Sequence, residues 1–111
     1  MKTVSITENL IYGEDKPAVT VLIKTVTTKE LRILMKKGQQ MKEHKAPYPI
    51  VIELFEGAID FGVEGEIQPL KKGDLIALDA NVPHDLHCTE DCIIRLTISV
   101  LDSEQRVKDV V

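Results

Sequence analysis

The sequence predicts an all-β protein, folded as a barrel or a sandwich of short strands. About ten segments of strand length, rich in apolar and β-branched residues, are separated by turn signals. No segment has the sustained helical periodicity of a long amphipathic helix. Some of the strands are apolar on both faces, which in so short a chain favours a neighbouring subunit covering one face.

The bulk properties predict one folded domain and exclude several function classes. A chain of 111 residues can build one core, so we expect a single domain over residues 1–111. The net charge of −4 argues against a nucleic-acid partner, which needs a basic face. No apolar run approaches the roughly 20 residues of a membrane span, and residues 1–9 hold no signal-peptide core. We therefore expect a cytoplasmic protein with no membrane partner.

The first part of the chain is predicted to be mostly strand. Residues 4–12 mix polar and apolar side chains as a strand does, and residues 13–17 form a turn that ends in proline. Residues 18–27 are dominated by β-branched side chains, which favour a strand. Residues 30–36 alternate with nearly a period of two, although a helix competes there because these residue types also tolerate one.

Further short strands are predicted beyond Gly38, each bounded by glycine, proline or acidic turns. The tail from Asp102 has too little apolar content to form a core alone, so a helical turn and a strand against a partner both stay open. The predicted strands in this part of the chain are residues 39–44, 50–55, 58–63, 66–70, 75–78, 84–88 and 92–100.

A glycine-to-glycine stretch resembles the first motif of the cupin superfamily. That motif reads Gly, five residues, His, one residue, His, three or four residues, Glu, six residues, Gly. Gly38, His44 and Gly57 fall in register with it. Ala46 and Ile50 stand where the family has its second histidine and its glutamate.

A later stretch resembles the second cupin motif, which reads Gly, five residues, Pro, one residue, Gly, two residues, His, three residues, Asn. Gly73 and His84 are in register. Asp79, Asn81 and Cys88 replace the proline, the glycine and the asparagine. Asparagine for glycine is a mild change, because asparagine also tolerates a left-handed backbone.

The resemblance covers about residues 30–100 and implies a double-stranded β-helix, or jelly-roll, barrel. Residues 1–27 lie outside this motif core. They resemble the extra strands with which cupins extend a neighbour's sheet, so the resemblance implies a homodimer. The family also implies a metal held inside the barrel by three histidines and a glutamate.

Carried over to this chain, the metal site keeps only two of its ligands. His44 and His84 could bind zinc, iron, nickel or manganese, with Cys88 as the candidate third ligand by strand parity. The alternative is a pocket without metal, in which the two histidines bind an organic ligand or are simply hydrogen-bonded. The apolar residues Ala46 and Ile50 favour this alternative, because each places an apolar side chain where a metal needs a ligand atom.

Strand parity extends the predicted ligand site beyond the histidines. Gln40 shares the parity of His44 and is expected to point inward, whereas His87 is expected to point outward. Tyr48, between two prolines, lines the mouth or packs for rigidity. Cys88 is a ligand contact or a small buried hydrophobe, and it is expected to be reduced in the cytoplasm. The predicted ligand-binding set is therefore Gln40, His44, Tyr48, His84 and Cys88.

Three function classes stay open on these residues. The first is a small cupin that binds an organic ligand, with or without a divalent metal, and has no assigned catalysis. The second is a metal-dependent enzyme of the isomerase or dioxygenase kind known in the family, using His44 and His84. The third is an assembly protein whose barrel serves as a dimer scaffold. Fold alone does not choose among them.

Overall fold

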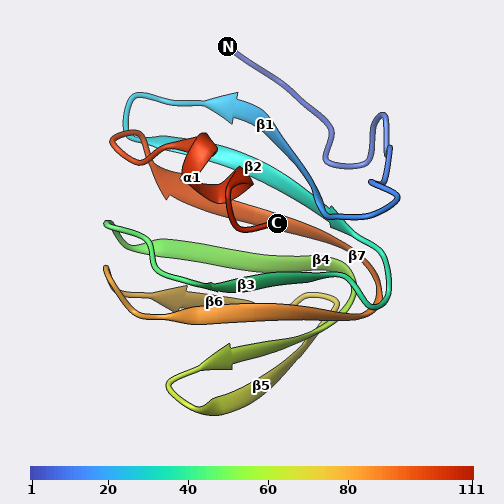
Figure 1. The fold of residues 1–111 in the computed structure, drawn as a ribbon. Coiled ribbons are helices and arrows are strands. Elements are labelled where there is room, and N and C mark those ends of the chain that lie inside the picture. Colours follow the sequence, from blue (N-terminus) through green and yellow to red (C-terminus); the bar gives the residue numbers. More distant parts are fainter.

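The computed structural model describes all 111 residues as a β-barrel with one short helix (Figure 1). The all-β prediction is confirmed. Two pairs of predicted strands are each continuous, so the sheet has fewer and longer strands than expected. The elements are β1 (Ala18–Lys24), β2 (Thr28–Met35), β3 (Gln40–His44), β4 (Ile50–Val63), β5 (Glu66–Lys71), β6 (Leu75–Leu78), β7 (His84–Ser99) and α1 (Glu104–Lys108).

Two long strands, β4 and β7, run side by side and serve both layers of the barrel. The first half of β4 pairs with β6 and its second half with β5. The second half of β7 pairs with β2, which in turn pairs with β1, and its first half pairs with β3. All these pairings are antiparallel. Register shifts between Leu54 and Ile59 bend β4 from one layer into the other.

Gly57 lies at this bend, where the sequence predicted a turn between two separate strands. Its φ is +87°, and an added Cβ would lie 2.2 Å from the carbonyl oxygen of Asp91 and 2.8 Å from the Cα of Cys92. The backbones of β4 and β7 therefore touch at their bends, and only glycine fits between them. The predicted break is a bend that keeps the strand intact.

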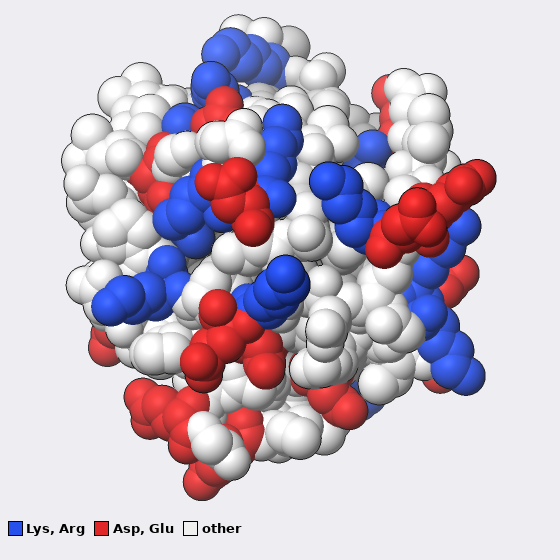
Figure 2. Space-filling view, viewed as in Figure 1, with Lys and Arg blue, Asp and Glu red and all other residues white.

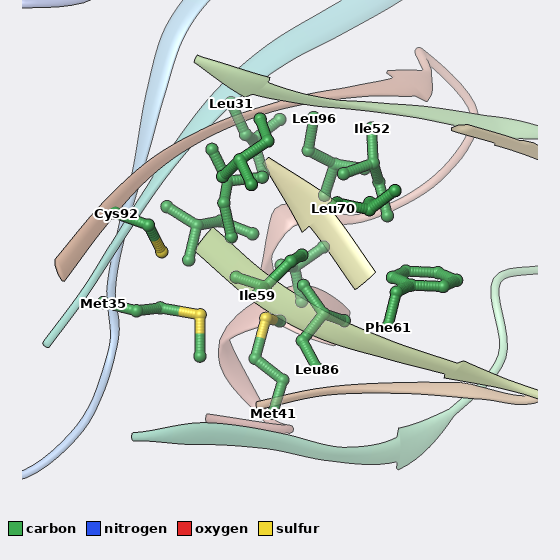
Figure 3. Close-up of a cluster of buried hydrophobic side chains, with 14 of the residues drawn as sticks. Leu31, Met35, Met41, Ile52, Ile59, Phe61, Leu70, Leu86, Cys92 and Leu96 are labelled. Atoms are coloured by element: carbon green, nitrogen blue, oxygen red, sulfur yellow. The ribbon is translucent and has the colours of Figure 1, made fainter. Parts of the chain in front are cut away.

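The barrel interior is apolar, as the labelled side chains in Figure 3 show by converging on one another from several strands. On β2, Leu31, Ile33 and Met35 point into this core, which confirms a strand over the competing helix. The outward face carries charge instead: the Arg95 guanidinium donates to Glu53 and Glu30, both at 2.7 Å. Figure 2 shows basic and acidic side chains interspersed over most of one face.

The predicted strand over residues 4–12 is wrong: no strand precedes β1. The guanidinium of Arg32, on the outer face of β2, donates to the carbonyl oxygens of Ile6 at 3.1 Å, Glu8 at 2.7 Å and Asn9 at 3.2 Å. Asn9 has a φ of 53°, which no strand residue adopts. These carbonyl groups are satisfied by one side chain rather than by a strand ladder.

The chain ends in the helical turn that was one of two predicted alternatives. The Ser103 hydroxyl caps α1 by accepting from the backbone N–H of Gln105 at 3.1 Å and of Arg106 at 3.3 Å. Figure 1 draws α1 against the upper strands, beside β1 and β2. The helix is far shorter than any membrane-crossing helix, and the structure contains no helix long and apolar enough for that role.

Candidate functional site

His44 and His84 lie together inside the barrel, at the junction of β3 and β7. They are direct partners in the β3–β7 register, and their ring centroids are 4.2 Å apart with an interplanar angle of 60°. The His84 ring also stacks on Phe61 of β4, at 5.6 Å and 14°. Three strands therefore fix the position of this pair.

Gln40 does not join the pair, and the prediction that it points inward is wrong. The β3–β7 register shifts between Met41 and His44, so that both of these side chains face the interior although they are three residues apart. The parity counted back from His44 therefore fails, and Gln40 is exposed. A bulge inside a strand of five residues leaves no signal in the hydrophobic pattern.

The hydrogen bonds of the two rings fix their tautomers. Nδ1 of His44 lies 2.5 Å from the carbonyl oxygen of Lys42, and Nδ1 of His84 lies 2.8 Å from that of Val82. A carbonyl oxygen only accepts, so each Nδ1 carries the proton. Nε2 of each neutral ring is then an acceptor, and it makes no hydrogen bond within the protein.

Burial keeps both rings uncharged at neutral pH. Desolvation lowers the pKa of His44 from 6.5 to about 4, against the opposing effect of its hydrogen bond to the Lys42 carbonyl. Desolvation also lowers the pKa of His84. The Arg106 guanidinium of α1 adds a smaller lowering effect on both. The pair is therefore a neutral acceptor site.

The space beside the histidines is almost filled. A cavity of about 10 Å³ remains, which is about the space that one water molecule needs. α1 closes it: the Val107 side chain is 1% exposed and belongs to the barrel core, and Arg106 also lines the cavity. The barrel strands contribute Ile33, Met41, Ile50, Ile52, Leu86, Ile94 and Leu96.

Cys88 points into the barrel, as its parity predicted, but the structure does not bring it to the histidines. It is four residues from His84 along β7, a span of about 13 Å. Its Sγ lies 2.9 Å from the Glu90 carbonyl oxygen, 3.4 Å from that of Met35 and 3.6 Å from Cys92 Sγ. Burial raises the pKa of this thiol and both cysteines are free. Cys88 is therefore a protonated thiol beside Cys92.

The remaining predicted residues lie outside the cavity. Tyr48 is half-buried in the loop between β3 and β4 and does not line it. His87 is exposed, as predicted, with its Nε2 3.8 Å from an Asp85 carboxylate oxygen. A larger open cleft of about 620 Å³ contains neither histidine. Ile50 is the one residue that lines both the cleft and the small cavity.

The donor set does not fit the metal centre that the cupin resemblance implies. The structure has no group of three or more His, Cys, Asp or Glu side chains that could hold a metal ion. Ala46 and Ile50 occupy the two missing ligand positions and are 3% and 4% exposed, packed in the core. Two imidazoles remain, whereas protein metal sites usually have at least three ligands.

Sequence reasoning missed Phe61, Arg106 and Val107 as parts of this site. A signal for the last two was present: Val107, Val110 and Val111 have helical spacing and follow the helix-capping Ser103. No comparable signal exists for Phe61, because its contact with His84 depends on the register between β4 and β7.

Comparisons with known proteins agree with the fold. A family model described as "Cupin domain" matches residues 31–100. The chain is similar to an RmlC-like cupin from Desulfovibrio desulfuricans, with 19% identity and a TM-score of 0.79 over 89% of this chain and 96% of that chain. It is also similar to an RmlC-like cupin from Shewanella frigidimarina, with 23% identity and a TM-score of 0.75 over 89% and 91%.

A third solved structure, KdgF from Halomonas sp., has 18% identity and a TM-score of 0.74, over 89% of this chain and 94% of that chain. None of the curated proteins matches the chain. These structural likenesses are all under 25% identity and show a shared fold.

Proposed function

The chain belongs to the cupin superfamily, and we propose that its barrel binds a small organic ligand at the His44–His84 pair. One observation carries this proposal: two neutral imidazoles, each with an unused Nε2 acceptor, line a cavity whose other lining residues are all apolar except Arg106. Binding sites for small molecules are typically apolar with a few placed polar groups. No catalytic step is assigned to the pair.

The alternative is a metal-dependent cupin enzyme of the isomerase or dioxygenase kind. It has less support, because Ala46 and Ile50 leave His44 and His84 as the only ligands. Two ligands would hold zinc, iron, nickel or manganese weakly. The two functions predict different metal contents for the purified protein.

The test compares the wild-type protein with a His44→Ala/His84→Ala variant, and uses His87→Ala as the control at an exposed histidine. Elemental analysis is done after incubation with each of the four metals, and thermal unfolding is followed across a set of small organic molecules. We expect stabilising molecules whose effect disappears in the double variant and persists in His87→Ala. Stoichiometric metal that only the double variant loses would favour the enzyme.

A further inference from the structure

The C-terminal segment, residues 103–111, occupies the part of the barrel that faces the two histidines. Val107 is buried in the barrel core, and Val110 and Val111 pack against the same core. Arg106 lines the histidine cavity together with Val107. An external ligand that reached His44 and His84 by this route would have to take the place of these side chains.

Few bonds hold this segment on the barrel. One backbone hydrogen bond joins it to a strand, from the N–H of Lys42 to the Val110 carbonyl oxygen at 3.1 Å. Two ion pairs join its start to the sheet, from Glu104 to Lys29 Nζ of β2 at 2.9 Å and to Lys24 Nζ of β1 at 3.9 Å. A helix of five residues is not stable in isolation. Detachment therefore breaks far fewer bonds than removal of any strand would.

The Arg106 charge is paired with the residue just before the segment, Asp102, which is buried and accepts a hydrogen bond from Lys29 Nζ at its carbonyl oxygen, at 2.8 Å. The guanidinium donates to both Asp102 carboxylate oxygens, at 2.7 and 2.6 Å, and this pair joins residues four apart in the chain. The opened pocket would then have aliphatic walls and two uncharged imidazoles. It would hold no unpaired cation to bind an anion, because the Arg106 charge is neutralised by Asp102.

This chemistry selects a class of ligand. Each Nε2 accepts a hydrogen bond, so the ligand must supply a donor. The walls favour an aliphatic body of compact shape. A carboxylate would lose its hydration without gaining a donor, and a ketone has no proton to give. A neutral alcohol meets both requirements.

We propose that a small aliphatic alcohol binds in the barrel in the place that the C-terminal segment now fills, so that the ligand and the segment compete. This rests on the proposed function, because it specifies the ligand of the same histidine pair. Competition lowers the apparent affinity of the closed protein by the fraction of molecules that are open. Variants that detach the segment should therefore bind the alcohol more tightly.

The experiment uses three probes that share one ring: cyclohexanol, cyclohexanone and cyclohexanecarboxylate. Binding is measured by NMR titration to the wild type and two detached variants. Val107→Asp places a charge in the apolar core, and Glu104→Gln removes the ion pairs with Lys29 and Lys24 while leaving the barrel interior intact. Lys108→Gln, an exposed change on the same helix, is the matched control.

Opening itself is measured without any ligand. Diethyl pyrocarbonate modifies accessible neutral imidazoles, and the exposed His87 is the internal standard. We expect faster modification of His44 and His84 in Val107→Asp than in the wild type. We also expect cyclohexanol to bind Val107→Asp about tenfold or more tightly than Lys108→Gln, with Glu104→Gln between the two, because it loses only partly exposed ion pairs. Cyclohexanone should bind at least about tenfold more weakly than the alcohol.

In the wild type, saturating cyclohexanol should also speed amide hydrogen exchange in residues 103–111. Equal cyclohexanol affinity in all variants, with unchanged exchange in this segment, would overturn the competition while the proposed function stands. If His44 and His84 become reactive in Val107→Asp but none of the three probes binds, the alcohol is wrong. If none of the wider set of small organic molecules binds to Val107→Asp either, the proposed function is wrong too.

Discussion

The two imidazoles in the barrel are held uncharged by the same burial that hides them from water. Their Nδ1 protons are donated to the backbone carbonyls two residues earlier in the chain, so neither ring can gain a second proton without placing a charge next to the other. At the residue scale, the site is therefore defined by its protonation state as much as by its shape.

This burial predicts that the protein loses stability in mild acid. His44 has a pKa of about 4 when folded and 6.5 when unfolded, so the unfolded chain takes up a proton first. The contribution to stability is complete above pH 6.5 and is lost as the pH falls from 6.5 toward 4. We expect the free energy of unfolding to fall by roughly 2 kcal/mol over this window, a figure that already allows for partial solvent screening of the ring.

The measurement is urea unfolding at several pH values between 7.5 and 4.5, on the wild type and on His44→Gln. The difference between the two proteins isolates the imidazole from the carboxylates that also titrate. A difference that stays constant across this range would contradict the prediction.

A second prediction at this scale concerns a variant that restores the two metal ligands present in the family pattern but missing here. Ala46→His with Ile50→Glu adds two donors at the buried positions where the family motif has its other ligands. Without metal the buried carboxylate should lower the melting temperature. Zinc should raise the melting temperature again. At a zinc concentration 100 times the Kd, binding should add about 2.7 kcal/mol to the free energy of unfolding. The same variant carrying His84→Ala should respond much less, and an equal response would count against a site at the histidines.

At the scale of the elements, the close approach of the β4 and β7 backbones makes Gly57 sensitive to any added side chain. Gly57→Ala adds a Cβ that meets backbone atoms at 2.2 and 2.8 Å, on a positive φ. We expect a loss of about 3 kcal/mol or more in the free energy of unfolding. Gly73→Ala is the control, because its φ of +92° is equally strained but nothing lies within 4 Å of the new atom. It should cost only about 1 kcal/mol, and equal losses would show that backbone strain alone matters.

The N-terminal segment gives another prediction, because one side chain holds it on β2. Arg32→Met removes the donors to the carbonyl groups of Ile6, Glu8 and Asn9. Amide hydrogen exchange over residues 5–9 should then rise to that of an undocked chain. Arg95→Met, opposite Arg32 in the β2–β7 register, should leave this segment protected. Protection that survives in Arg32→Met would mean that other contacts hold it.

The elements also show where sequence patterns suffice and where they do not. Alternation identified the central strands, and the left-handed tolerance expected of Asn81 is confirmed by its φ of 66°. The bends near Gly57 and the shift before His44 were missed, because a bulge changes which face a residue occupies without changing the composition. The Arg32 contacts were missed because they join segments more than 20 residues apart.

At the scale of the whole molecule, the barrel is closed by its own C-terminal end, and β1 is one of the edge strands of the sheet. β1 pairs only with β2, so its outer edge has free backbone groups on which a second copy could add a strand. We propose that the protein forms a homodimer that uses its N-terminal residues. Light scattering should give the mass of a dimer for the full chain and of a monomer after deletion of residues 1–12, and a monomer in both would contradict this.

The sharing of β4 and β7 between the two layers bears on how the molecule comes apart. Neither layer has its full set of strand pairings without the halves of these two strands. A break in one layer therefore removes the pairing partners of the other, and no half of the barrel can persist alone. Loss of β-structure and exposure of the tyrosines should follow a single transition in urea, with coincident midpoints. The pocket, which lies on both strands, would then vanish in one step with the fold.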